Sequence, residues 1–264
     1  MHIEELDPAQ RSRPEDGAGG TSRDAASGLP SRIEQAVEER LGAAVERAAG
    51  HVPDSVRPKL RGWLHAGAVP VVLAAGIVLV ALSRGPAELL ASTIYAVTTV
   101  LLFTVSAVYH RGQWSRRTHA VLQRFDHANI FLLIAGTYTP FAVLLLAGGQ
   151  RTTLLAIVWG CALLGVCFRL AWVNAPRWLW VPAYVALGWV AVVFLPDIMR
   201  AGGVAVLVLV AVGGILYTLG AIVFATRKPD PYPAWFGFHE VFHTLTLLAY
   251  VCQYVAVSLV VYTH

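Results

Sequence analysis

Four ionisable residues have the types and the spacing of a metal site: His110, Asp126, His239 and His243. His239 and His243 are four residues apart, so on a helix both imidazoles project from one face and can hold one ion. Ser106 stands four residues before His110, which places a hydroxyl one turn away on the same face. Histidine with carboxylate suits zinc, and also iron, manganese or nickel. Three imidazoles leave a fourth position for water, the pattern of a catalytic rather than a closed structural site.

Each of these residues also has an ordinary interpretation. A histidine at a helix end, such as His110, is commonly an interfacial side chain, and Asp126 could cap a helix or pair with Arg124 or Arg111. Neighbouring residues on a helix point about 100° apart, so we favour Asp126 over His127 as the inward-facing partner. The other histidines lack the spacing or depth of a ligand and are expected to be ordinary: His2, His51, His65, His119 and His264.

The elements that must position these residues are membrane helices. Hydrophobic residues make up 56% of the 264 residues and charged residues only 14%, against about a quarter charged in a soluble domain. The net charge of +4 is scattered among short loops, which argues against a nucleic-acid partner. Seven apolar stretches without Asp, Glu, Lys or Arg approach the roughly 20 residues that span a bilayer: Trp63–Leu82, Leu89–Tyr109, Ala128–Ala147, Thr152–Phe168, Trp178–Leu195, Gly202–Thr226 and Val241–Tyr262. They predict an all-α integral membrane bundle of seven transmembrane helices, with sequential neighbours antiparallel.

The distribution of Lys and Arg predicts the orientation of this bundle. With the N-terminus cytoplasmic and the C-terminus outside, eleven basic residues fall on the cytoplasmic side: Arg57, Lys59, Arg61, Arg111, Arg116, Arg117, Arg124, Arg169, Arg177, Arg227 and Lys228. Only Arg84, Arg151 and Arg200 fall outside, a clear positive-inside signal. We therefore expect a multi-pass protein of the cell (inner) membrane.

This topology brings the candidate ligands to one level of the bilayer. His110 is expected to close the second helix, Asp126 and His127 to open the third, and His239 and His243 to open the seventh. All these positions lie at the cytoplasmic side, although only Lys and Arg entered the topology argument. Ionisable groups at membrane helices are functional candidates by default, and their convergence strengthens the prediction of a metal site.

Two segments precede the bundle, which we place at residues 57–264. Residues 1–30 are rich in Gly, Ser, Arg, Asp and Pro and are predicted to be a disordered polar tail. Residues 31–56 are predicted to hold a short amphipathic cytoplasmic helix and a linker, with Ser31 and Glu34 as a capping box. We expect this helix to lie on the membrane surface or on the bundle.

Four blocks resemble the hemolysin III family: Ser106-Ala-Val-Tyr-His110, Arg124-Phe-Asp126-His127, Ala135-Gly-Thr-Tyr-Thr-Pro-Phe141 and Phe238-His239-Glu-Val-Phe-His243. That family is the bacterial relative of the progestin and adipoQ receptors, in a wider group with the alkaline ceramidases. The likeness runs from about Arg57 to the C-terminus. It implies a zinc ion near the cytoplasmic face held by His110, His239 and His243, with Asp126 contacting the zinc-bound water and Ser106 beside it.

Three functions agree with these residues. The first is an intramembrane zinc hydrolase acting on a lipid amide or ester, with Asp126 as general base and Ser106 as donor to the oxyanion. The second is a receptor or membrane-state sensor in which the metal is structural, and the third is the pore-forming cytolysin of the family name. Haem binding between the histidines is a further alternative. Membrane lipid is the predicted environment and candidate substrate, and the sequence leaves protein partners open.

Overall fold

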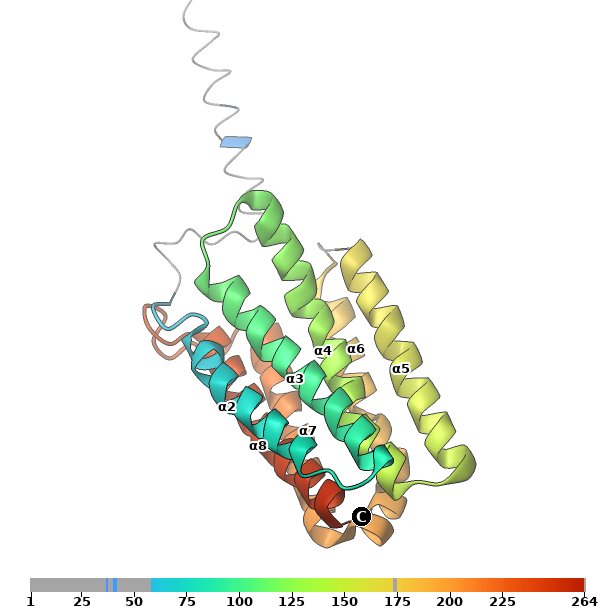
Figure 1. The fold of residues 1–264 in the computed structure, drawn as a ribbon. Coiled ribbons are helices and arrows are strands. Elements are labelled where there is room, and N and C mark those ends of the chain that lie inside the picture. Colours follow the sequence, from blue (N-terminus) through green and yellow to red (C-terminus); the bar gives the residue numbers. More distant parts are fainter. Residues whose placement is uncertain (1–36, 38–39, 42–57, 173–174, 264) are drawn as a thin grey trace, which may run out of the picture. The chain divides into compact units, whose positions relative to one another are not determined.

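The computed structural model describes residues 37, 40–41, 58–172 and 175–263. The chain divides into two compact units, Met1–Val52 and Pro53–His264, and the second contains the helical bundle (Figure 1). Its elements are α2 (Trp63–Ala81), α3 (Pro86–Arg111), α4 (Arg116–Leu145), α5 (Gly148–Ala171), α6 (Arg177–Gly188), the 3₁₀ segment η2 (Trp189–Phe194), α7 (Leu195–Thr226) and α8 (Phe238–Thr263). The all-α prediction is therefore confirmed for the described residues of this unit.

Six helical segments are long and apolar enough to cross a membrane, by length and composition. Five of them are α2, α3, α4, α5 and α8, and they correspond to the first four and the last of the seven predicted stretches, to within two residues at the C-terminal ends of α2 and α4. The sixth segment is a 50-residue helical run, Arg177–Thr226, which contains both the fifth and the sixth predicted stretches. As a straight helix it would be about 75 Å long, more than twice the roughly 30 Å thickness of a bilayer core.

This long run folds back on itself. Gly203 interrupts α7 with φ 79° and ψ 175°, a backbone conformation open only to glycine. As a result Trp180 of α6 meets Phe224 of α7, with ring centroids 5.6 Å apart. Closer to the fold-back, Trp189 Nε1 donates a hydrogen bond of 3.0 Å to Thr218 Oγ1. The run therefore consists of two helical legs packed side by side, one for each predicted stretch.

The start of α4 differs from the prediction. The apolar stretch indicated a helix from Ala128, but α4 begins at Arg116, where the Ser115 hydroxyl accepts a hydrogen bond from the Thr118 N–H. Asp126 and His127 therefore lie three turns inside the helix and do not open it. The prediction was wrong because hydropathy detects the lipid-embedded part of a helix, whereas a capped polar segment can extend it beyond the apolar part.

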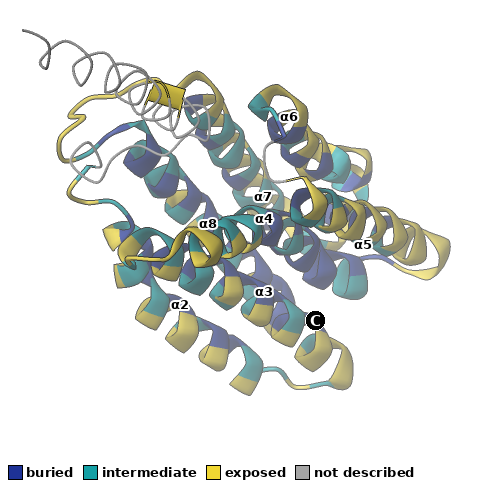
Figure 2. Ribbon diagram, turned by 90° about the horizontal axis from the view of Figure 1, so that it is seen from above, coloured by how far each residue is buried: buried dark blue, intermediate teal, exposed yellow. Residues whose placement is uncertain are grey.

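Helix α4 is the centre of the bundle. It packs against α3, α5, α6, α7 and α8, and two-thirds of its apolar window is buried, against 22% for α5. Figure 2 shows the exposed residues on the outward faces of α2 and α5 and the buried ones turned toward α4 and α8. An outer surface of aliphatic side chains is the expected surface toward lipid.

The Ala135–Phe141 block forms the packing core around α4. Gly136 lies directly against Thr98 of α3, where a Cβ would collide with the Thr98 hydroxyl. Thr139 Oγ1 accepts a hydrogen bond from Trp159 Nε1 of α5. The Tyr138 hydroxyl donates to the Gly188 carbonyl at 2.6 Å and accepts from the Ala191 N–H at 2.8 Å, so it satisfies the backbone where α6 changes to η2. This block therefore contributes to architecture.

The predictions for residues 1–56 lie outside the described residues, with the exception of Val37, Arg40 and Leu41. These three residues are helical. They fall within the predicted amphipathic helix.

Candidate metal centre

Three histidines from two helices meet at one end of the bundle. His110 is the last but one residue of α3, and His239 is the second residue of α8, with His243 one turn further on. This placement confirms that His110 closes its helix and that the histidine pair opens the last one. The two helices are separated by more than a hundred residues in sequence, so only the fold brings the imidazoles together.

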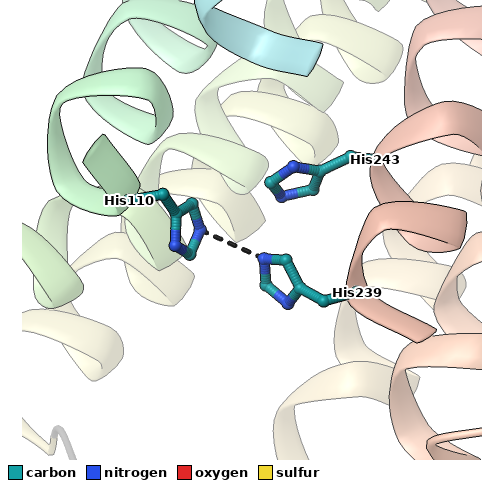
Figure 3. A group of neighbouring side chains, drawn as sticks. All are labelled: His110, His239 and His243. Carbon is teal, nitrogen blue, oxygen red and sulfur yellow. Dashed lines mark hydrogen bonds between the residues drawn. The ribbon is translucent and has the colours of Figure 1, made fainter. Parts of the chain in front are cut away.

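The three rings point toward a common centre (Figure 3). His110 Nε2 and His239 Nε2 are 3.1 Å apart, and one ring nitrogen from each of the three residues lies within 4.8 Å of the others. Nitrogen ligands about 2.1 Å from a tetrahedral zinc ion would lie roughly 3.4 Å apart. A small closure of the His243 ring toward the other two would therefore complete such a set.

The chemistry of the donor set fits a divalent ion. His239 and His243 are buried, and one ring nitrogen of each lies within 4.8 Å of a ring nitrogen of His110. Neutral imidazoles buried at a membrane interface are costly unless they bind something. Three nitrogen ligands with a nearby carboxylate suit zinc and related transition metals, which makes this cluster a candidate metal site.

Asp126 lies beside the triad without being one of its three members. Its Oδ2 atom is 3.8 Å from His110 Nε2, close enough for a carboxylate that acts on a group held by the histidines. The Ser106 side chain is next to Asp126, and both line the same cavity. The structure thus brings together all five residues predicted for the site.

His127 is turned away from the triad, as predicted. Its Nδ1 atom lies 2.9 Å from the carbonyl oxygen of Gln123, and its ring packs against Trp180 of α6. It lines the cavity but is not one of the clustered ligands.

The cavity leads from this site into the bundle. It has a volume of about 240 Å³ and is lined at one end by Ser106, Asp126 and His239, and further in by Ile198 and Gln253. The lining positions on α8 extend over 15 residues from His239 to Gln253, about 21 Å along the helix. A volume of about 240 Å³ spread over this length makes the cavity long and narrow. Most of the remaining wall is apolar, so the cavity suits an extended hydrocarbon chain.

Glu240 stands between the two α8 histidines in sequence, but it faces elsewhere. The segment His239–His243 has the order His-Glu-x-x-His, in which soluble zinc peptidases use the Glu as general base. Here Glu240 Oε2 accepts a hydrogen bond from the Gly237 N–H at 2.9 Å, and Oε1 lies 3.9 Å from Arg61. Glu240 therefore caps the start of α8, whereas Asp126 is the acid beside the triad.

Sequence reasoning missed His65. This residue was expected to be ordinary, yet it lies in the first turn of α2, is only 2% exposed and packs against the site. A signal was available, because the predicted topology puts the start of the first helix at the same level as His110. The sequence does not indicate how that helix is rotated about its axis, and so does not show whether His65 faces the bundle.

Comparison with known proteins identifies the family of this chain. The pattern of the family described as Haemolysin-III related matches residues 54–254. The chain is 34% identical over 152 residues to the Hemolysin-3 homolog of Bacillus subtilis (strain 168), covering 57% of this chain and 71% of that protein. It is also 34% identical over 149 residues to Hemolysin-3 of Bacillus cereus, covering 55% of this chain and 66% of that protein. The chain, a multi-pass membrane protein with a buried three-histidine cluster, therefore belongs to the Haemolysin-III related family.

Proposed function

We propose that this protein is a zinc-dependent hydrolase that cleaves a lipid amide or ester within the membrane. The observation that carries the proposal is the position of the three-histidine cluster: it lies at one end of a long apolar cavity, with Asp126 3.8 Å from His110. A metal site with a carboxylate beside it and a hydrocarbon-sized channel leading from it combines the parts that such a reaction needs.

We further propose seven membrane crossings in the inner membrane, with a cytoplasmic N-terminus and an external C-terminus. The fold-back at Gly203 supports two crossings by the Arg177–Thr226 run. His110 lies at the end of α3 beside Arg111, and His239 opens α8 after the loop that carries Arg227 and Lys228. The positive-inside rule therefore favours a site near the cytoplasmic face.

When bound, zinc would act as a Lewis acid and supply hydroxide from water near neutral pH. His110, His239 and His243 would hold the ion. The Asp126 carboxylate would accept a proton from the attacking water and pass it to the leaving amine or alcohol. The Ser106 hydroxyl, on the same cavity wall, would donate a hydrogen bond to the carbonyl oxygen as negative charge develops on it.

A lipid substrate is favoured by the surroundings of the cavity. Its wall includes Val192 and Ile215, which are 46% and 50% exposed on the surface of the bundle. The cavity therefore borders the region where lipid would lie. An acyl chain could occupy the channel while its amide or ester carbonyl stands at the histidines.

The proposal is tested in two steps. Metal content is measured by mass spectrometry on the purified wild type, on a His239→Ala/His243→Ala double variant and on His127→Phe as a control. Near-stoichiometric zinc is expected in the wild type and the control, and little in the double variant. The zinc-loaded protein is then incubated with a panel of N-acyl sphingoid and glycerolipid substrates. Absence of zinc from the wild type, or no cleavage of any substrate by loaded protein, would refute the hydrolase.

A sensor or receptor with a structural metal is the second candidate. It is favoured by the fact that one ion would join α3 to α8 through His110 and the α8 pair. In that case removal of the metal should unfold or rearrange the bundle, and the carboxylate of Asp126 should be dispensable for the output.

A cytolytic activity is suggested only by the printed names of the two Bacillus relatives. It is tested by dye release from liposomes. Release that persists in the His239→Ala/His243→Ala variant would support a pore that does not depend on the metal.

A further inference from the structure

Helix α2 contributes a fourth histidine to the surroundings of the triad. His65 lies at the same end of the bundle, and among the described residues it is not one of the clustered ligands. It is nevertheless among the most buried polar side chains, at 2% exposure. A buried imidazole next to a metal site requires a reason, because its desolvation is unfavourable without compensating contacts.

Three contacts fix the His65 ring. Its Nδ1 atom is 2.8 Å from the Ser106 hydroxyl. Its face stacks on His243, with centroids 3.8 Å apart and an interplanar angle of 10°. Phe103 packs edge-on from α3 at 4.8 Å. The ring therefore joins one predicted ligand to one predicted catalytic side chain.

This stacking replaces a contact that metal-binding histidines normally have. Such a residue usually donates its second ring N–H to a carboxylate or carbonyl, which fixes the orientation of the ring. His243 Nδ1 has no hydrogen-bond partner in the described part of the chain. The parallel face of His65 lies nearer to the His243 ring than His110, His239 or Phe242 does, and it restrains rotation of that ring.

We propose that His65 is a positioning residue that orients His243 for metal binding and Ser106 for the substrate carbonyl. The first role acts through ring stacking and the second through the Nδ1 hydrogen bond. The inference rests on the proposed function, in that it takes the histidine cluster to hold a metal. It adds a residue of α2, a helix that contributes no ligand.

The two roles are separable by substitution. His65→Phe keeps an aromatic ring against His243 and loses the bond to Ser106. His65→Asn keeps a polar nitrogen near the position of Nδ1 and loses the stack. His65→Ala loses both, and His127→Phe replaces a histidine at the same end of the bundle whose ring does not contact the triad residues.

The readout is zinc affinity of the purified protein in detergent, measured by competition with a chromophoric chelator, with thermal melting as a check of folding. We expect His65→Ala and His65→Asn to lose affinity by roughly 10- to 100-fold, the usual effect of losing an outer partner of a ligand. His65→Phe and His127→Phe should stay within about threefold of wild type. The Co²⁺-substituted protein should show an altered visible spectrum in His65→Asn and not in His65→Phe.

Two outcomes would overturn the positioning role. One is His65→Ala or His65→Asn with wild-type affinity; the other is His65→Phe with a loss equal to that of His65→Ala despite a wild-type melting temperature. Failure of the underlying metal proposal looks different, because then the wild type itself binds no zinc. If a cleaved lipid is found, Ser106→Ala and His65→Phe should reduce turnover equally, and the double variant no further.

Discussion

Gly62 lies against His110, and only glycine fits there. A Cβ at residue 62 would stand 2.6 Å from the Cβ of His110, and the backbone of Gly62 has φ +76°. Gly62 immediately precedes α2, so the entry of the chain into its first membrane helix is packed directly on a predicted ligand. The position of His110 therefore depends on the residue that introduces α2.

Gly62→Ala should weaken metal binding more than it weakens the fold. The left-handed backbone adds strain of about 1–2 kcal/mol, and the new methyl group must displace His110 from its present position. We expect at least a tenfold loss of zinc affinity by chelator competition. Gly67→Ala, in α2 with open space at its Cβ position, is the control and should leave affinity unchanged. Equal affinity in the two variants would show that His110 can move without cost.

Tyr138→Phe should destabilise the bundle without removing metal. The Tyr138 hydroxyl bridges the Gly188 carbonyl and the Ala191 N–H at the junction of α6 and η2. Its loss leaves a partly buried backbone N–H unpaired, which costs about 1–3 kcal/mol. Unfolding in mixed micelles should detect this decrease in the free energy of unfolding. Tyr232→Phe, at a side chain that is 73% exposed, should leave the free energy of unfolding unchanged. An equal decrease in both variants would argue that the two Tyr138 hydrogen bonds do not stabilise the bundle.

The triad was predictable because it depends on periodicity and depth alone. A spacing of four residues puts His239 and His243 on one helix face, and counting apolar stretches puts His110 at their level. Neither inference requires knowing how a helix is rotated about its axis or which helices pack against it. The same holds for the choice of Asp126 over His127, which required only the angle between adjacent helical residues.

The contacts of His65 were not predictable, because apolar residues stand all around α2. Such a helix has no polar face that would reveal which side meets the bundle, so the direction of His65 follows only from packing against α3 and α8. The early start of α4 was missed for a related reason. The polar turns from Arg116 to Arg124 are held by the Ser115 cap, and hydropathy does not register them as helix.

The fold-back at Gly203 makes a specific prediction for topology. In a variant whose native cysteines are replaced by alanine, single cysteines at Ala201 and Tyr232 should label from opposite sides of the membrane. Ala201→Cys should react with an impermeant maleimide in intact cells, and Tyr232→Cys only after permeabilisation. Arg84→Cys and Arg116→Cys serve as the outer and inner references. If the long run crossed only once, Tyr232→Cys would label from outside.

Asp126 and Glu240 make a matched pair of acids near the histidines, and of the two it is Asp126 whose carboxylate lies beside His110. Its carboxylate lies 3.8 Å from His110 Nε2, whereas Glu240 contacts the Gly237 N–H and Arg61. Asp126→Asn should keep zinc near wild-type content and reduce lipid turnover by at least 100-fold, in line with the 10²–10⁴-fold contribution of a general base. Glu240→Gln should keep turnover within a fewfold and lower the melting temperature, because the buried start of α8 loses a charged acceptor.

Zinc content and turnover are measured on the same preparations, so that loss of metal is not mistaken for loss of chemistry. The reverse result is an inactive Glu240→Gln variant and an active Asp126→Asn variant. It would mean that Glu240 is the general base, as in the soluble peptidases, and that its side chain turns toward the metal when the metal binds. Full activity in both variants would exclude a carboxylate base at this site. Another group of the site would then have to accept the proton of the attacking water.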